Sequence, residues 1–350
     1  MAAYTAIDDP GTLFNTKLWT GTSAIHEITG MGFQPDLIWV KCRDAGSRSH
    51  VWTDSVRGTD SQLSCDNTDA QTTYTNVVTA FGADGFTMGA DTATGEMNES
   101  TDTFVGWNWK AGTTSGIGGS PSITPTGYSF NQAAGFSIIA YTGTGANATL
   151  PHGLGVAPDF IITKELDAGG NDWGVFHASL GATKAAWLNT TTAAGTSASY
   201  WNDTAPTSTL FTVGTNTQSN GSGTDYVAYC FAQKQGFSRF GSYYGNGSSD
   251  GTVVNLGFRP AWTMITSVTG SYGWDILDDQ RAGFNPDNEN LMSNTNGVED
   301  DTNNYWDLMS NGFKIMSSTG NVGTNNYQYL FMAFASNPFV NSSGVPGNVR

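Results

Sequence analysis

Residues 32–41 read GFQPDLIWVK, and closely similar phrases stand at 155–164 (GVAPDFIITK) and 257–265 (GFRPAWTMI). Each phrase places a glycine and a proline just before a run of apolar residues rich in β-branched and aromatic types, which favours a β-strand. Proline has no N–H to donate to a sheet, so it suits the first position of a strand. The phrase therefore predicts a turn that leads into a strand, used three times in one chain.

The neighbours of this phrase recur with it. A second apolar segment follows each time, as FVGWNWKA at 104–111, YVAYCFAQ at 226–233 and YLFMAFAS at 329–336. The separations between the proline and this segment, measured to Val105, Val227 and Leu330, are 70, 69 and 70 positions. Markers in a fixed order at a fixed period indicate an internal repeat.

We therefore expect three units of about 100 residues, at 1–111, 136–236 and 237–339. The segment 112–135 between the first two units is rich in Gly, Ser, Thr and Pro, which is typical of a linker or an extended arm. Residues 340–350 form a short tail.

Two of the recurring segments, YVAYCFA and YLFMAFA, are apolar at consecutive positions. Because successive side chains of a strand point to opposite faces, this pattern predicts a strand in a sheet that is covered on both faces. No long stretch shows a helical period, and short apolar runs end at Gly, Asn, Asp or Pro. We expect an all-β protein of three tandem antiparallel β-sandwich repeats, jelly-roll or lectin-like, which together make a long, stiff surface.

Charge excludes two classes of partner. The net charge is −16, with 14 Lys and Arg in 350 residues and no basic cluster. Binding to nucleic acid or to an anionic membrane surface requires cations, so neither is expected. Charged residues make up only 13% of the chain, so Ser, Thr, Asn and Gly must cover the surface. Such an uncharged, hydrogen-bonding surface is common in extracellular and virion β-proteins.

Targeting and cysteine signals point to synthesis in a reducing cytoplasm. No run of 18 apolar residues predicts a membrane span, and the N-terminus MAAYTAIDDPGTLF lacks the features of a secretory signal. The three cysteines, Cys42, Cys65 and Cys230, fit no disulfide or metal framework, and we expect no cofactor and no bound metal. A phage virion protein combines cytoplasmic synthesis with an exterior-type surface.

Longer segments carry a resemblance. They include LPHGLGVAPDFIITK (150–164), TDYVAYCFAQKQGFSRFGSYYGNGSSDG (224–251) and DTFVGWNWKAG (102–112). Together they resemble a largely uncharacterised repeat family of tail-fibre and virion structural proteins from tailed phages, especially marine and cyanobacterial ones. The resemblance covers nearly the whole chain. It implies a virion location, other virion proteins and copies of the chain as partners, and it supplies no catalytic residue.

Catalytic motifs point away from an enzyme. No GxSxG or HExxH pattern occurs, and His152 in PHGLG is interpreted as a turn histidine. Glu96 and Glu99 lie in a polar stretch, and a polysaccharide depolymerase using paired carboxyl groups is kept as a minor alternative. The acidic stretches 284–290 and 298–304 suit either a calcium site or a solvated loop.

The aromatic residues give the candidate contacts. Trp39, Trp107, Trp109 and Trp262 lie in apolar runs and are expected in the core. Other rings lie in polar stretches, where they can stack on sugars, anchor a protein interface or plug the ends of the sandwiches. The candidates for glycan or interface contacts are Trp173, Trp201, Tyr243, Tyr244, Trp274 and Trp306.

Two functions from different classes remain. The first is a tail fibre or other host-facing protein that binds a bacterial surface glycan. The second is a non-adhesive architectural protein of the particle, such as a capsid decoration, head fibre or tail adaptor. The sequence favours the first, and a homo-oligomer is expected in both.

Overall fold

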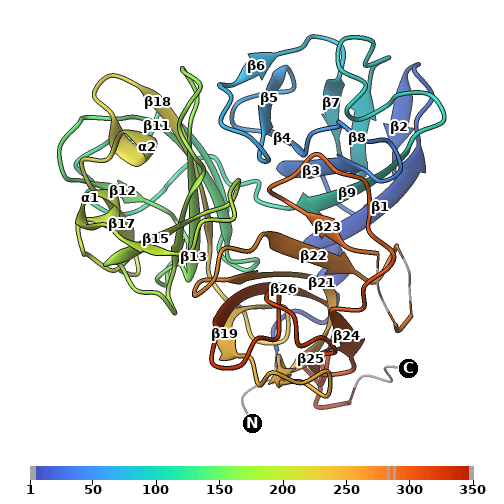
Figure 1. Ribbon diagram of the computed structural model, residues 1–350. Coiled ribbons are helices and arrows are strands. Elements are labelled where there is room, and N and C mark those ends of the chain that lie inside the picture. Colours follow the sequence, from blue (N-terminus) through green and yellow to red (C-terminus); the bar gives the residue numbers. More distant parts are fainter. Residues whose placement is uncertain (1–4, 282–283, 287–288, 347–350) are drawn as a thin grey trace.

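The computed structural model describes residues 5–281, 284–286 and 289–346, and antiparallel sheets account for nearly all of its regular structure (Figure 1). Three large sheets each have a smaller sheet beside them, and each pair draws its strands from one segment of the chain. The prediction of an all-β fold of antiparallel sandwiches is confirmed.

Residues 14–109 build unit 1. Its large sheet has the order β1 (Phe14–Thr20), β9 (Thr103–Trp109), β3 (Leu37–Cys42), β4 (Val51–Asp54), β5 (Ser61–Ser64) and β6 (Thr72–Thr73). Its small sheet has the order β2 (His26–Ile28), β8 (Gly85–Met88) and β7 (Val78–Gly82). A short 3-10 helix, η1 (Pro10–Thr12), precedes the first strand.

Residues 127–231 build unit 2. The large sheet runs β10 (Gly127–Asn131), β11 (Phe136–Thr142), β18 (Asp225–Phe231), β13 (Phe160–Glu165), β14 (Gly174–His177), β15 (Lys184–Trp187) and β16 (Gly195–Thr196). The small sheet pairs β12 (Ala148–Pro151) with β17 (Leu210–Val213), beside two short helices, α1 (Ala198–Trp201) and α2 (Thr217–Asn220).

Residues 238–338 build unit 3. The large sheet has the order β19 (Ser238–Tyr244), β26 (Gln328–Pro338), β21 (Phe258–Ser267), β22 (Trp274–Asp278) and β23 (Leu291–Met292). The small sheet has the order β20 (Val253–Asn255), β25 (Gly312–Ile315) and β24 (Trp306–Met309). In units 1 and 2 the recurring proline phrase leads into a central strand of the large sheet, β3 or β13, whereas in unit 3 Pro260 lies inside the central strand β21.

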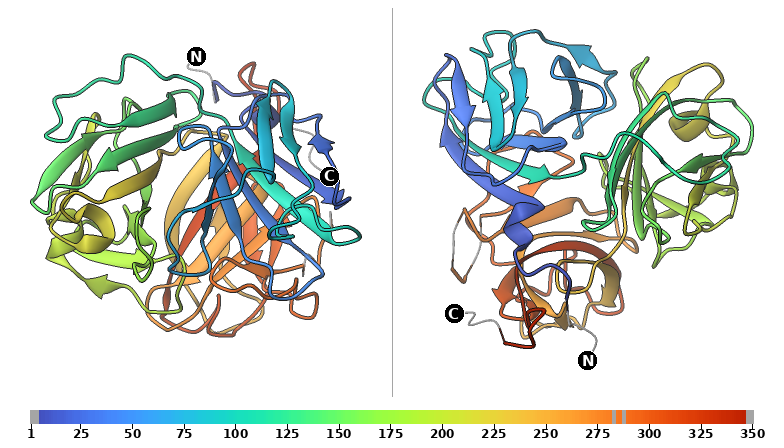
Figure 2. Two further views of the ribbon diagram at one scale, coloured as in Figure 1. Left: turned by 90° about the horizontal axis from the view of Figure 1, so that it is seen from above. Right: turned by 180° about the vertical axis from the view of Figure 1, so that it is seen from behind.

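The three large sheets meet around one shared hydrophobic core (Figures 1 and 2). One continuous cluster of buried side chains takes Trp39 and Trp109 from unit 1, Phe231 from unit 2, and Trp262 and Phe334 from unit 3. Three further clusters fill the space between each large sheet and its small sheet. The prediction that the three units form a long, stiff array is therefore wrong. The inner faces of the three large sheets are apolar, and they pack against one another.

Strand β18 shows why the recurring segment is apolar at consecutive positions. Val227, Tyr229 and Phe231 point into the shared core, whereas Tyr226, Ala228 and Cys230 point into the core of unit 2. Both faces of the sheet are thus covered, as the sequence pattern predicts.

Residues 112–135 are more than a linker. Strand β10 lies inside this segment and pairs with β11, from Gly127 opposite Ala140 to Asn131 opposite Phe136. The Phe130 ring is buried and closes over Gly153. Residues 127–131 therefore extend the large sheet of unit 2 by one edge strand.

The chain ends meet the body of the protein at unit 3. Thr5 Oγ1 donates a hydrogen bond to the backbone oxygen of Gln235 over 2.8 Å, and the Ser342 amide donates to the Asp8 carboxylate over 2.6 Å. Residues 1–4 of the expected first unit and 347–350 of the expected tail lie outside the described residues.

Candidate functional site

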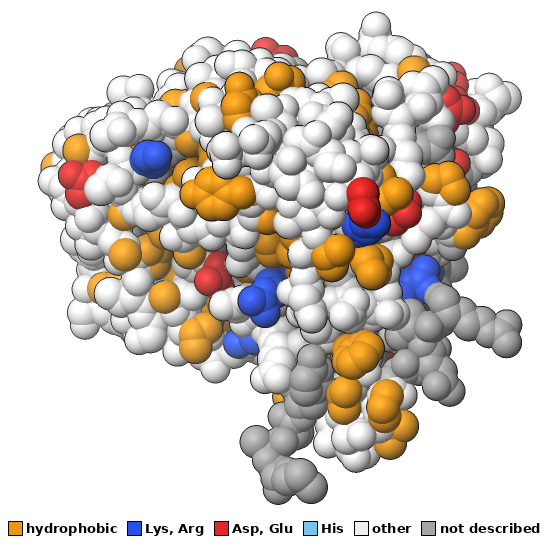
Figure 3. All heavy atoms as spheres, turned by 60° about the horizontal axis from the view of Figure 1, so that its bottom comes forward, with side chains coloured by type: hydrophobic (Ala, Val, Ile, Leu, Met, Phe, Trp, Pro, Cys, Tyr) orange, Lys and Arg blue, Asp and Glu red, His pale blue; other side chains and the backbone are white. Residues whose placement is uncertain are grey.

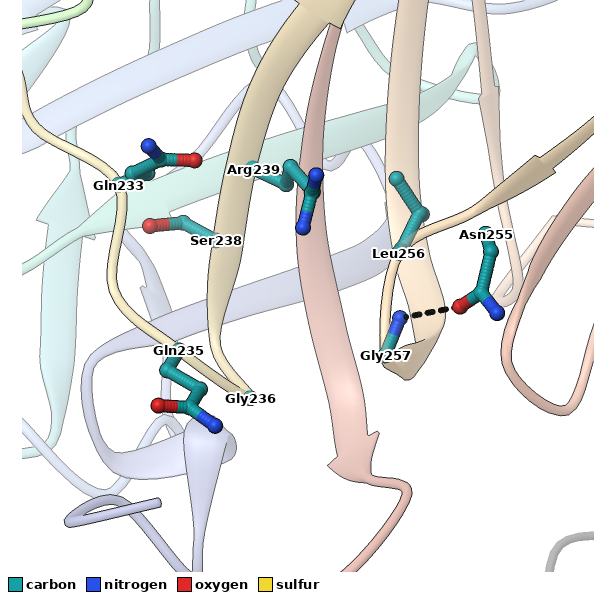
Figure 4. A pocket seen from close by; sticks show the side chains of 8 residues that line it. All are labelled: Gln233, Gln235, Gly236, Ser238, Arg239, Asn255, Leu256 and Gly257. Carbon is teal, nitrogen blue, oxygen red and sulfur yellow. Dashed lines mark hydrogen bonds between the residues drawn. The ribbon is translucent and has the colours of Figure 1, made fainter. Parts of the chain in front are cut away.

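A polar pocket lies in unit 3, where the connection from unit 2 enters β19 (Figure 4). Its volume is about 640 Å³. The residues that line it are Gln233, Gln235, Gly236, Ser238, Arg239, Asn255, Leu256 and Gly257. They come from two segments of the chain, residues 233–239 at the entry to β19 and residues 255–257 between β20 and β21.

The alternation of side chains along β19 determines where the Arg239 side chain lies. Ser238 is 3% exposed, whereas Arg239, the next residue of β19, is exposed on the opposite face of the sheet. Figure 4 shows the Arg239 side chain reaching from β19 across β26 toward the turn at residues 255–257. The guanidinium therefore stands at the open end between the two sheets of unit 3.

Among the described residues that line the pocket, one is a cation and none carries a carboxylate. Within the described part of the chain, the Arg239 side chain makes no hydrogen bond and no ion pair. Two other polar groups are held in place: Asn255 Oδ1 accepts from the Gly257 amide over 3.0 Å, and Ser238 Oγ accepts from the Lys234 amide over 3.0 Å. The amides of Gln233 and Gln235 add uncharged donors and acceptors.

In unit 1, the position that corresponds to the pocket is closed. Asn15 is the counterpart of Arg239, because Asn15 pairs with Asn108 in the sheet of unit 1 and Arg239 pairs with Ala333 in the sheet of unit 3. In unit 1, Asn15 Nδ2 donates to the Met31 oxygen over 3.2 Å and Lys17 Nζ donates to the Gly30 oxygen over 2.5 Å. These bonds join the edge strand to the turn before β3.

Unit 2 closes it differently. The residue at this position is Ser137, opposite Cys230, and Ser137 is fully buried. The Phe130 ring of β10 covers the turn at Gly153. Unit 3 alone has an extended, unpartnered side chain there and an open space, so its pocket is the strongest candidate for a binding site.

Five of the six aromatic candidates from the sequence are not on the surface. Trp173, Trp201, Tyr243, Trp274 and Trp306 are at most 6% exposed. Their side chains are therefore not available to a glycan from solution, whereas Tyr244 is 61% exposed. The expectation that Trp39, Trp107, Trp109 and Trp262 lie in the core is confirmed.

Two of the buried rings form hydrogen bonds to a neighbouring unit. Trp173 Nε1 donates to the Ser64 oxygen of unit 1 over 3.1 Å, and Trp274 Nε1 donates to the Trp187 oxygen of unit 2 over 2.8 Å. The polar residues beside these rings in the sequence do not show that other parts of the fold cover the rings. These two indoles satisfy their N–H groups on a neighbouring unit, whereas Trp306 Nε1 donates to Thr263 of its own unit and Trp201 Nε1 has no partner among the described residues.

A smaller polar cavity of about 180 Å³ lies in unit 1. Asp69 and Glu96 line it together with Ser49, Gln62 and Tyr74, among others. Burial raises the pKa of Glu96 to about 7, and its Oε2 atom has no hydrogen-bond partner among the described residues. Glu96 can therefore hold a proton near neutral pH.

The remaining candidates have structural partners. His152 Nδ1 accepts from the Leu154 amide over 3.2 Å, which confirms the interpretation as a turn histidine. Glu299, in the acidic stretch 298–304, makes a two-bond contact with Arg43 of unit 1 at 3.0 and 2.9 Å. Of the stretch 284–290, residues 287–288 lie outside the described residues, and Glu289 also contacts Arg43 at 3.3 Å. No group of three or more His, Cys, Asp or Glu in the described part could hold a metal ion.

The surface matches the composition. Figure 3 shows one face on which few charged side chains stand apart among uncharged atoms. In the described ranges, no helix has the length and apolar character needed to cross a bilayer.

A family profile matches residues 9–338, nearly the whole chain, and its description reads domain of unknown function (DUF7483). The chain belongs to the DUF7483 family. No curated protein matches it. The DUF7483 match spans all three units, so the family domain comprises the closed three-unit body and not a single sandwich.

Sequence reasoning missed the unit 3 pocket. Its central residue, Arg239, lies in GFSRFGSYY, where a lone cation stands in a strand of mostly small and aromatic residues. That contrast is the only local signal. The partners at residues 233–235 and 255–257 join it only through the sheet.

Proposed function

We propose that this protein is a structural protein of a tailed-phage particle that faces the host and binds a glycan of the bacterial surface. The observation that carries the binding role is the open polar pocket of unit 3, with a volume of about 640 Å³. Small-ligand sites commonly measure roughly 300–1,000 Å³. Amide, hydroxyl and guanidinium groups line it, and these are the partners that sugar hydroxyls require.

The character of the surface supports this proposal. Only 13% of the residues are charged, so contacts with a neutral or weakly charged glycan would depend on hydrogen bonds. Such contacts keep most of their strength in salt, because screening acts on exposed charges. The location in a phage particle rests on the sequence resemblance, which also implies other virion proteins and copies of the chain as partners.

Competition for adsorption tests the proposal. Purified protein is added to host cells, and the phage that remains unadsorbed is counted. We expect a dose-dependent fall in adsorption. A Gln235→Trp variant, which adds bulk at an exposed position of the pocket, should compete poorly. A Tyr244→Ala variant should compete normally if the pocket, and not the exposed ring, is the site.

Unchanged adsorption with folded protein in its native oligomeric state would overturn the adhesive role. The architectural alternative would then lead, as a capsid decoration, head fibre or tail adaptor. Loss of competition in Tyr244→Ala alone would move the binding site from the pocket to the end of β19.

Polysaccharide cleavage is a second candidate, and the cavity at Glu96 favours it. Asp69 and Glu96 both line that cavity, and glycoside hydrolysis uses two carboxyl groups of which one is protonated. Incubation with host polysaccharide should then release reducing ends, and Glu96→Gln should abolish the release. Absence of any release would leave binding as the only activity.

A further inference from the structure

We propose that the unit 3 pocket recognises a sugar that carries a single carboxylate, of the uronic-acid type, within an otherwise neutral glycan. This inference rests on the proposed glycan-binding function and names the ligand class for the same site. Three observations lead to it: the unpartnered guanidinium, the absence of a carboxylate in the lining, and the closure of the same place in the other two units.

The guanidinium is the first observation. Arg239 reaches into the pocket, and within the described ranges its side chain has no hydrogen bond or ion pair. By contrast, Arg43, Arg57 and Arg281 each contact a carboxylate at 3.0 Å or less. A guanidinium matches a planar carboxylate with two parallel hydrogen bonds. In a chain with 30 Asp and Glu against 14 Lys and Arg, a cation without such a partner stands out.

The lining limits the ligand to one negative charge. Apart from Arg239, the described residues of the lining offer only uncharged groups: two glutamines, a serine, an asparagine, a leucine and two glycines. These groups suit hydroxyl groups and do not neutralise further anions. The net charge of −16 also disfavours a densely charged polyanion, because like charges repel over a Debye length.

In units 1 and 2, residues of the chain fill the position that corresponds to the unit 3 pocket. Unit 1 bridges it with Asn15 and Lys17, and unit 2 buries Ser137 there and covers the turn with Phe130. In both units, side chains of the same unit therefore close the end of the sandwich. In unit 3 the turn and the edge strand stay apart, and a carboxylated sugar would bridge Arg239 to the groups opposite it.

Paired oligosaccharides test the inference. Titration calorimetry measures binding of trisaccharides that contain one glucuronic or galacturonic acid, each compared with the same trisaccharide after reduction of its carboxyl to CH₂OH. We expect the acidic member to bind more tightly by roughly tenfold or more, the usual value of a charge-assisted hydrogen bond. Arg239→Gln should remove this preference and leave binding of the reduced member nearly unchanged.

Controls separate the charge from the geometry. Arg239→Lys keeps the charge but loses the planar fork, so part of the preference should remain. Lys184→Gln removes an exposed cation of unit 2 and should change nothing. Circular dichroism of each variant confirms that it is folded.

Each outcome separates the two proposals. Equal binding of acidic and reduced members, or a preference that survives Arg239→Gln, overturns the acidic-sugar inference and leaves glycan binding in place. Binding to host cells without binding of any trisaccharide also overturns it. Failure to bind either the trisaccharides or the cells overturns both.

Discussion

The indole N–H of Trp107 donates a hydrogen bond of 2.9 Å to Oδ2 of Asp278, joining the central strand of unit 1 to unit 3. Asp278 is the last residue of β22, and its counterpart Asp54 is the last residue of β4. Asp54 Oδ2 accepts from Tyr229 of unit 2 over 2.8 Å. The same device thus links unit 3 to unit 1 and unit 1 to unit 2.

His177 closes the ring. It is the last residue of β14, and its Nδ1 atom accepts from the Ser179 amide over 3.0 Å. The Nε2 atom therefore carries the proton and faces the Phe331 oxygen of unit 3 at 3.4 Å. Each unit thus has a polar side chain at the end of one strand, β4, β14 or β22, that contacts the next unit. The contacts run from unit 1 to unit 2, from unit 2 to unit 3 and from unit 3 to unit 1.

Trp107→Phe should destabilise the protein more than Trp109→Phe. Both residues lie in β9 and in the shared core, but the Trp109 N–H has no hydrogen-bond partner among the described residues. The first substitution leaves the buried Asp278 carboxylate without one donor, so we expect an extra loss of about 1–3 kcal/mol. Urea unfolding of both variants measures the difference. Equal losses would mean that the bond between Trp107 and Asp278 adds nothing beyond packing.

The three units should unfold as one. Their inner faces share a single core, so unfolding of one unit would expose the other two. We expect coincident transitions by tryptophan fluorescence and far-ultraviolet circular dichroism.

For the same reason, residues 112–236 alone should not fold to a native state. The isolated segment would expose Phe136, Phe160 and Phe231, which now pack against the other units. We expect it to bind a hydrophobic dye and to lack near-ultraviolet circular dichroism. A cooperative transition of the isolated segment would show that the shared core is dispensable.

Asp275 should lower the free energy of unfolding as pH rises from about 4 to 7, whereas the buried His152 and His177, whose pKa values burial lowers to about 4, act in the opposite direction. This carboxyl is fully buried, and burial raises its pKa from 3.8 to about 7 against the opposing effect of hydrogen bonds from Asn290 and Asn321. Between these two values the folded state binds a proton that the unfolded state has released, so folding is favoured at the acidic end of the window and weakened toward its upper end.

Asp275→Asn should remove the contribution of Asp275 to the pH dependence. Urea unfolding at a series of pH values gives the slope, and Asp203→Asn, at an exposed position, serves as the matched control. We expect the slope of the free energy of unfolding between pH 4 and 7 to shift toward positive values only in the first variant. An unchanged slope would show that Asp275 does not titrate in this range.

Gly153→Ala should cost more stability than Gly30→Ala. The two glycines occupy corresponding turns and have nearly the same positive φ, 72° and 73°, so backbone strain is matched. A Cβ at residue 153 would lie 2.7 Å from the Phe130 ring, whereas at residue 30 the nearest atom is Lys17 Nζ at 3.6 Å. The extra loss should be about 1–3 kcal/mol in thermal or urea unfolding. It should disappear in a Phe130→Ala background.

Part of the fold could be read from local patterns. The phrase around Pro35 predicts a turn and a strand, and the structure has β3 at Leu37–Cys42. The consecutive apolar residues of YVAYCFA predict a sheet covered on both faces, as found for β18. These features depend on residues close in the sequence, whose side chains alternate between the faces of a strand.

Other features depend on residues far apart, and these the sequence did not reveal. Trp173 and Trp274 stand among polar residues, yet their rings are buried because the next unit covers them. Glu299 stands in an acidic stretch, yet it meets Arg43 from the other end of the chain. Local polarity describes a segment and does not describe what packs against it.

Local periodicity and composition were enough to predict the strands, the threefold recurrence of the strand markers and the uncharged polar surface. The closure of the three large sheets around one core could not be predicted in this way, since an apolar face can be covered by any apolar partner. The tertiary structure also places Arg239 of β19 and the turn at residues 255–257 on two sides of one pocket. Pairing of β19 with β26 and of β26 with β21 sets that distance, and no local pattern encodes it.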